Sequence, residues 1–525
     1  MTPGTPVVTI IGGGLAGCEA AWQVASRGVR VRLHEMRPVR PTLVHQGDRL
    51  AELVCSNSFR GDKLDNAVGV LKEEMRRLGS IIMRCAEATR VPAGAALAVD
   101  RGRFADAVTA AICAHPLIEV VREEITAIPA AGATGGPVIV ATGPLTSDTL
   151  SQDIARFVGA EHLSFYDAIS PIVLAESIDR SIVFRASRWG RSLRGDERRA
   201  SSTPTRVGSE SAHLEGTGVA ELARQADSTA ESGSLQAAGC SLPEAEPEAE
   251  GPACGVDDGE GDYLNCPMDE AEYRAFYDAL VSAESATVHD FDSVQFFEGC
   301  LPIEVMAHRG RETLRFGPMK PVGLPDPRTG RIPFAVVQLR QDTLAGDHFS
   351  LVGFQTQLKW GDQARVLRMI PGLQDAEFVR FGMVHRNTYI NGPMVLLPTW
   401  QTRAREDLFF AGQVSGVEGY VESAGSGLLA GINAAHQALA LSPIEAPRET
   451  AIGALAYYVS HAEARHYQPT NITFGIMPPL ELPAARRSRG EGGPRRKDQR
   501  KEALAQRALQ ALDNWMGQVA IGAPA

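Results

Sequence analysis

The sequence has 525 residues, of which 44% are hydrophobic and 22% charged, and its formal net charge is −11. These values are typical of a soluble globular chain, and about 150 residues per domain predicts roughly three domains. The apolar runs are shorter than the ~18–20 residues of a membrane helix, and residues 1–11 lack the pattern of an export signal. We therefore expect a cytoplasmic protein with no membrane partner. Taken as a whole-chain average, the acidity argues against a nucleic-acid partner.

The first motif is GxGxxG at residues 12–17. It follows a predicted strand of β-branched residues at 7–11 and leads into a predicted helix over 16–27. A second predicted strand over 29–33 leads to Glu35. This is the position where an acidic side chain accepts hydrogen bonds from a ribose hydroxyl. The glycines of the motif GxGxxG allow a tight turn, close approach of a pyrophosphate and close helix–strand packing. This predicts a dinucleotide site, with FAD or NAD favoured over NADP and a glycine-rich turn without ligand as the alternative. The predicted cofactor contacts are Gly12, Gly13, Gly14, Leu15, Ala16, Gly17 and Glu35.

A second half of this site comes from distant segments. The predicted strand 137–140 leads to Gly143, and the predicted strand 407–411 leads into a glycine-rich stretch whose residues 423–435 have a helical pattern. The helix N-terminus could contact a second part of the cofactor. The further predicted contacts are Gly143, Gly412, Gly416, Glu418 and Gly419.

We therefore predict an α/β protein with a Rossmann-like, FAD-binding domain of the glutathione-reductase type. It is discontinuous, with residues 1–150 and 396–445 on either side of an inserted α/β substrate domain at 151–395. Residues 446–525 form a C-terminal helical segment.

Within the insertion, residues 201–260 hold 12 acidic and two basic residues. Their polarity predicts a disordered acidic loop over 191–261, with an acidic interaction segment as the alternative. Without residues 201–260 the chain has 51 acidic and 50 basic residues, so the acidity no longer argues against RNA.

A basic run at residues 484–501 carries a net charge of +6. It is interpreted as a loop, followed by a helix over 501–515. A solvated loop and a phosphate-contacting patch are equally compatible with its composition.

Eight cysteines are present and none forms a CxxC pair, so no metal site is predicted. In a reducing cytosol they are expected to be free thiols, and most free cysteines are core residues. Cys266 is interpreted as structural, in a turn, and Cys240 and Cys254 lie in the predicted disordered loop.

Several long segments carry a family resemblance. The glycine-rich stretch at 411–435, together with the N-terminal motif, resembles the GidA-related flavoproteins that modify tRNA. Residues 50–80, 261–268 and 296–324 are similar to the TrmFO family, the folate- and FAD-dependent tRNA (uracil-5-)-methyltransferases of bacteria. The resemblance runs from residue 7 to about residue 515, and the acidic loop is its main departure.

The resemblance implies methylation of the T-loop uridine of tRNA at C5. The carbon would come from 5,10-methylenetetrahydrofolate, FAD would carry it, and NAD(P)H would reduce the flavin. tRNA, through its T-arm, and folate are the expected partners, with no obligate protein partner. The family's two functional cysteines match Cys55 and Cys300.

The chemistry explains why thiols are needed. A thiolate that adds to C6 of uracil turns C5 into a nucleophile, and a second group must remove the C5 proton. We predict that Cys300 is the nucleophile and that Cys55 is its acid/base partner or a flavin-side thiol. Weaker candidates for flavin, folate or phosphate contacts are His385, Arg386, Arg309, Arg311, Arg315 and Lys320.

Three other functions stay open at this stage. The first is a GidA-type enzyme acting on wobble uridine with a GTPase partner, although that family is longer at its C-terminus. The second is a flavin-dependent oxidoreductase of small molecules with no RNA role. The third is a non-enzymatic FAD-binding protein.

Overall fold

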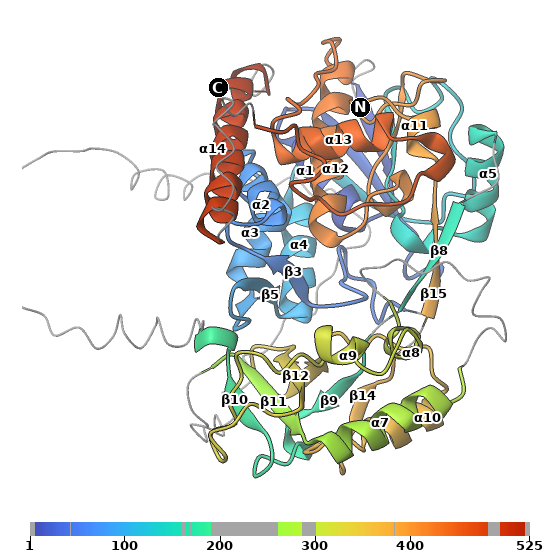
Figure 1. Cartoon of the computed structure of the whole chain (residues 1–525). Helices are drawn as coiled ribbons and strands as arrows, with labels where there is room; N and C mark the ends of the chain where they lie inside the picture. Colours follow the sequence, from blue (N-terminus) through green and yellow to red (C-terminus); the bar gives the residue numbers. More distant parts are fainter. Residues whose placement is uncertain are drawn as a thin grey trace, which may run out of the picture. The chain divides into compact units, whose positions relative to one another are not determined.

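The computed structural model describes residues 6–42, 44–159, 163–168, 170–190, 261–285, 301–382, 384–480 and 494–519 (Figure 1). The chain divides into one unit of residues 1–194 and 257–525 and a second unit of residues 195–256. The predicted acidic loop lies outside the described residues except for Gly261. None of the described helices combines the length and apolar character needed to cross a membrane.

Both ends of the chain contribute to one five-stranded sheet, in the order β16-β7-β1-β2-β6, with parallel neighbours throughout. A strand such as β1 is rich in β-branched residues because helices cover both faces of a parallel sheet. Val8 and Ile10 of β1 are fully buried. The strands are β1 Val7–Ile11, β2 Arg30–Glu35, β6 Ile118–Arg122, β7 Val138–Val140 and β16 Leu408–Phe410.

Helix α1 (Leu15–Ala25) packs along α12 (Tyr420–Ala438), as Figure 1 shows. The contact is made by backbone: a Cβ on Gly427 would lie 2.2 Å from the carbonyl oxygen of Ala16, and one on Gly431 would lie 2.7 Å from that of Ala20. The remaining helices of this part are α2 Ala67–Arg77, α3 Ile81–Ala88, α4 Arg101–Ala114, α5 Asp148–Val158, α11 Gly392–Val395, α13 Ala451–His461 and α14 Pro494–Val519.

A small antiparallel sheet, in the order β3-β5-β4, is formed within the first hundred residues. Its strands are β3 Ser58–Gly61, β4 Arg90–Val91 and β5 Ala96–Val99. Short 3-10 helices lie at η1 Gly143–Leu145, η2 Ala175–Ser177, η3 Arg188–Gly190, η5 Gln413–Ser415 and η6 Ala464–His466.

The middle of the chain forms a six-stranded antiparallel sheet, in the order β10-β11-β12-β13-β9-β14. The chain enters this region through β8 (Leu163–Ala168) and returns through β15 (Val384–Tyr389), which pair with each other. The sheet strands are β9 Ile172–Leu174, β10 Phe184–Ala186, β11 Tyr263–Met268, β12 Ala335–Gln341, β13 His348–Leu351 and β14 Phe378–Arg380. The helices are α7 Glu270–Ser282, α8 Ile303–His308, α9 Thr313–Phe316 and α10 Trp360–Leu367.

The α/β class and the Rossmann-like sheet built from both chain ends agree with the sequence prediction. The domain limits at residues 150 and 395 stay predictions. Helix α7 buries Tyr273, Phe276 and Leu280 in one core cluster with residues of the six-stranded sheet, which gives the inserted region a core of its own.

Two local predictions were wrong. Cys266 lies in strand β11 and not in a turn. Pro267 is tolerated there because β10 pairs only as far as Asn265, which leaves that side of the proline without a strand. Helix α14 begins at Pro494, within the basic run predicted as a loop, because a proline in the first turn needs no hydrogen-bond partner for its nitrogen.

The close contact between α1 and α12 makes a prediction about stability. Gly427→Ala should lower the free energy of unfolding by about 1–3 kcal/mol, because the new Cβ would overlap the backbone of Ala16. Urea unfolding of the purified protein measures this. Gly517→Ala on α14 is the control, because its Cβ would meet open space, and it should leave stability unchanged or raise it by up to about 1 kcal/mol. Equal effects of the two changes would contradict the account.

Candidate active site

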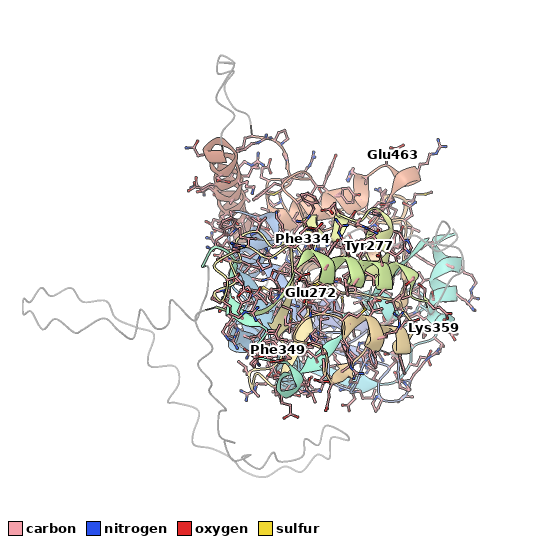
Figure 2. All side chains as sticks on the ribbon, turned by 60° about the horizontal axis from the view of Figure 1, so that its bottom comes forward. Glu272, Tyr277, Phe334, Phe349, Lys359 and Glu463 are labelled. Atoms are coloured by element: carbon pink, nitrogen blue, oxygen red, sulfur yellow. The ribbon has the colours of Figure 1, made fainter. Side chains whose placement is uncertain are left out.

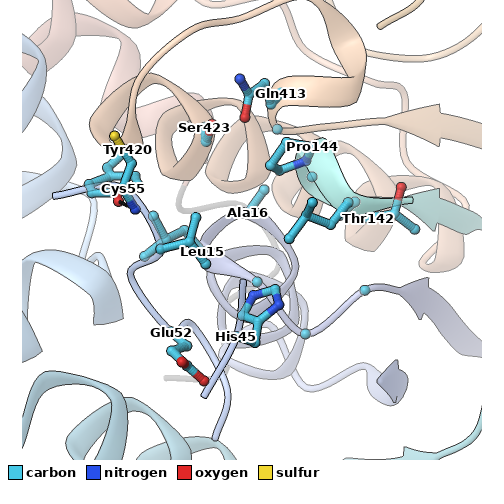
Figure 3. A pocket seen from close by; sticks show the side chains of 18 of the residues that line it. Leu15, Ala16, His45, Glu52, Cys55, Thr142, Pro144, Gln413, Tyr420 and Ser423 are labelled. Atoms are coloured by element: carbon cyan, nitrogen blue, oxygen red, sulfur yellow. Dashed lines mark hydrogen bonds between the residues drawn. The ribbon is translucent and has the colours of Figure 1, made fainter. Parts of the chain in front are cut away.

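A cavity of about 390 Å³ lies where strands β1, β2, β7 and β16 end at their carboxyl sides (Figure 3). This edge is where open parallel sheets bind ligands. Ten of the twelve predicted cofactor contacts line it. They are Gly12, Gly13, Gly14, Leu15, Ala16, Glu35, Gly143, Gly412, Glu418 and Gly419.

The turn between β1 and α1 is open toward the cavity. A Cβ on Gly12 would lie 2.5 Å from the carbonyl oxygen of Ala141, whereas one on Gly14 would meet nothing within 4 Å. Gly14 is the N-cap of α1, and no side chain caps this helix end. The turn therefore offers room and backbone N–H groups to an oxyanion such as a pyrophosphate.

Glu35 ends β2 as a fixed anion. Its Oε2 accepts the N–H of Gly13 at 3.0 Å, and its Oε1 accepts the backbone N–H and the Nε of Arg37 at 3.0 and 2.8 Å. Burial opposes ionisation, but hydrogen bonds and charge from Arg37 hold the pKa of Glu35 below its usual value. The carboxylate is therefore charged and held in one orientation at the cavity wall.

Two of the predicted contacts lie where the chain packs closely on itself. Gly17 and Gly416 are not among the described residues that line the cavity. A Cβ on Gly17 would lie 1.8 Å from the carbonyl oxygen of Gly12, and one on Gly416 would lie 2.1 Å from the hydroxyl of Tyr467. Both glycines therefore permit close approach of other parts of the chain.

Cys55 lines the cavity. It lies in the segment of residues 53–57, which we call the Cys55 loop. The hydroxyl of Tyr420, the first residue of α12, accepts the backbone N–H groups of Cys55 and Ser56 at 2.8 and 3.0 Å. Burial, and then the nearby Cys55, raise the pKa of Tyr420, so the phenol keeps its proton. Sequence reasoning missed Tyr420; its position directly after Gly419, at a helix start, was the available signal.

The cavity has two distinct ends. In Figure 3, Cys55 and Tyr420 lie side by side, away from His45 and Glu52. Glu52 belongs to the Glu35 end, because its carboxylate pairs with Arg37 at 3.2 Å. One continuous cavity thus joins the dinucleotide motif to the thiol of Cys55.

Other predicted residues are not among the described residues that line the cavity. Cys300, Cys240 and Cys254 fall outside the described residues. His385 and Arg386 are on β15, where their backbone pairs with β8. Cys266 is fully buried in β11, and burial raises the pKa of its thiol.

Arg311 and Arg315 contact side chains of the inserted region. Arg311 pairs with Asp278 at 2.9 Å and lies over the ring of Tyr277. Arg315 lies 3.6 Å from the ring centre of Phe334; Figure 2 labels both rings. Among the described residues that line the cavity, none is Arg309, Arg311, Arg315 or Lys320.

Comparison with known proteins defines the family. The family model described as glucose inhibited division protein A matches residues 7–207 and 249–442. A methylenetetrahydrofolate–tRNA-(uracil-5-)-methyltransferase TrmFO of Symbiobacterium thermophilum is 51% identical over 97% of both chains. The protein of the same name from Geobacter sulfurreducens is 50% identical over 98% of this chain and 100% of its own.

Solved structures share the fold. The structure of Aquifex aeolicus GidA covers 99% of this chain, and this chain covers 74% of it, with a TM-score of 0.59 and 16% identity. With near full-length identity of about one half to proteins named TrmFO, and with the GidA-type fold around its cavity, the chain belongs to the TrmFO family of GidA-related proteins.

Proposed function

We propose that this protein methylates C5 of the T-loop uridine of tRNA in the cytoplasm, without an obligate protein partner. It takes the methylene of 5,10-methylenetetrahydrofolate and uses FAD, with NAD(P)H as the electron donor. The observation that carries the proposal is the single cavity that joins the dinucleotide-binding turn to Cys55. The names of the relatives favour this activity over wobble-uridine modification and over small-molecule oxidation.

The residues that line the cavity favour one orientation of bound FAD. Glu35 would bind a ribose, and the N–H groups at the start of α1 would bind the pyrophosphate. Because the adenosine and the flavin lie at opposite ends of FAD, its flavin ring then belongs at the other end of the cavity, beside Cys55 and Tyr420. When bound there, FAD supplies the carrier for the methylene and, once reduced, the reducing equivalents.

The two cysteines would act on the uracil ring. Addition of the Cys300 thiolate to C6 forms a carbon–sulfur bond and makes C5 nucleophilic. Once the one-carbon unit is bonded to C5, Cys55 would remove the C5 proton as that carbon leaves its carrier, which gives a methylene on C5. Two electrons and a proton from the reduced flavin would then convert the methylene to a methyl group, while the ring double bond re-forms and the bond from C6 to Cys300 breaks. Tyr420 assists by holding the backbone on which Cys55 is carried.

The assay that tests this function combines unmodified tRNA transcript, labelled methylenetetrahydrofolate, NADH and FAD-loaded protein. We expect labelled 5-methyluridine after digestion, located in the T-loop. An active, FAD-loaded preparation that produces none would contradict the proposal, as would a product at the wobble position.

Cys55→Ala and Cys300→Ala should each lower methylation by more than about a hundredfold, because each removes a group that acts on the ring. FAD content, measured from the absorption spectrum, should stay unchanged. Cys113→Ala on α4 is the matched control and should keep full activity. Full turnover by the Cys300 variant would overturn its assignment as nucleophile.

Glu35→Gln should raise the dissociation constant for FAD by about tenfold or more, because the substitution removes a charged acceptor. Fluorescence titration of the apoprotein measures this, with Glu73→Gln on α2 as the control. Since Arg37 holds the pKa of Glu35 below its usual value, wild-type affinity should be constant from pH 8 to 5. It should weaken only below the ordinary carboxyl pKa of about 4.3. Loss of affinity already near neutral pH would contradict this role.

The part of the basic run that lies on α14, residues 494–501, is proposed to bind tRNA phosphates. Changing Arg495, Arg496, Arg500 and Lys501 together to Gln should weaken tRNA binding. It should also reduce the slope of log K against log salt by about one for each phosphate that is no longer neutralised. Arg274→Gln with Arg365→Gln, two exposed arginines of α7 and α10, is the control. An unchanged salt slope would show that the run is only a solvated surface.

A further inference from the structure

The Cys55 loop is held at every residue. The carbonyl oxygen of Leu53 accepts a hydrogen bond from Arg101 at 3.2 Å, and that of Val54 accepts one from Arg380 at 3.4 Å. The next two backbone N–H groups, those of Cys55 and Ser56, donate to Tyr420. These contacts fix the backbone of the loop that carries Cys55 at the cavity wall.

Arg340 makes the most specific of these contacts. Its Nε donates to Oδ1 of Asn57 at 2.7 Å, and its Nη2 donates to the hydroxyl of Ser56 at 2.8 Å. Asn57 is fully buried, and its Nδ2 donates to the carbonyl oxygens of Val99 and Gln341, each at 3.0 Å. The planar fork of the guanidinium thus fixes the two residues that follow Cys55, a geometry that lysine cannot reproduce.

The contacts come from the six-stranded sheet and from helices of the dinucleotide-binding part. Arg340 is on β12 and Arg380 is on β14, and both strands belong to the six-stranded sheet. Tyr420 is on α12, which packs on the parallel sheet. Arg340, Cys55 and Tyr420 all line the cavity. The thiol is therefore placed by the six-stranded sheet of the inserted region and by a helix of the dinucleotide domain together.

The arginines around the loop lie in a buried and partly ion-paired environment. Arg101 pairs with Asp342 at 3.1 Å. Burial lowers the pKa of Arg340, and it lowers that of Arg380 to about 10, which leaves Arg380 a cation at pH 7. Charge-assisted hydrogen bonds are roughly twice as strong as neutral ones, so these arginines hold the loop firmly.

We propose that Arg340 is a positioning residue that holds the Cys55 loop, through Ser56 and Asn57, so that the thiol meets the flavin end of the cavity. The inserted region thereby contributes a residue that positions the reaction centre. This inference rests on the proposed methylation for its kinetic consequence, but the position of Cys55 can be measured without any turnover.

The experiment compares Arg340→Met and Arg340→Lys with the control Arg365→Met, an exposed arginine of α10. The first readout is the rate at which iodoacetamide alkylates Cys55 in FAD-loaded protein, followed by mass spectrometry of the Cys55 peptide. The second is kcat and KM for methylation. Asn57→Ala, alone and combined with Arg340→Met, tests whether the two residues act through one contact.

We expect both Arg340 variants to keep FAD and to change the alkylation rate by more than about threefold. Their kcat should fall by about tenfold to a hundredfold, with little change in KM for folate. The double variant should be no worse than the poorer single variant. Arg365→Met should match the wild type in every readout.

Two results would overturn the inference. If Arg340→Met and Arg340→Lys leave alkylation of Cys55 at the wild-type rate, Arg340 does not position the loop, whatever happens to turnover. If the effects of Arg340→Met and Asn57→Ala multiply, the residues act separately. A wild-type protein that makes no 5-methyluridine would instead count against the proposed function, because the alkylation readout does not depend on it.

Discussion

The packing of α1 against α12 is the interaction on which the rest of the structure depends. The two helices come from opposite ends of the chain, and glycine at 427 and 431 lets α12 approach the backbone of α1 without any side chain between them. This packing closes one domain around an inserted region. It also brings both helix N-termini to the same edge of the parallel sheet, where their free N–H groups and positive ends favour an anionic ligand.

The two helix starts organise the cavity. At the start of α1, Gly14 leaves room for a pyrophosphate. At the start of α12, Tyr420 receives the N–H groups of the Cys55 loop. The positions of Glu35 and Cys55 are thereby set by rigid elements, which the proposed reaction needs because it depends on orientation. The six-stranded sheet of the inserted region contributes Arg340, which holds the Cys55 loop through Asn57.

Local sequence was enough to predict the strand–turn–helix unit after residue 7, because its glycines and Glu35 act within one short segment. The helical spacing of Leu512 and Trp515 was also enough to predict the C-terminal helix, and both residues are buried on α14. The partners of the Cys55 loop could not be predicted this way. Arg340 reaches Asn57 only because a distant strand folds beside it, and no periodicity in the sequence reports that pairing. Cys300 lies outside the described residues, so its role stays a prediction.

The central claim is that the flavin end of the cofactor lies at Cys55 and its adenosine end at Glu35. A crystal structure of the FAD-loaded protein tests this most directly, through the separation between the flavin ring and the sulfur of Cys55. We predict van der Waals contact or nearly so, at about 4 Å, with the ribose of the adenosine hydrogen-bonded to Glu35. A flavin ring at the Glu35 end, or outside the cavity, would contradict it.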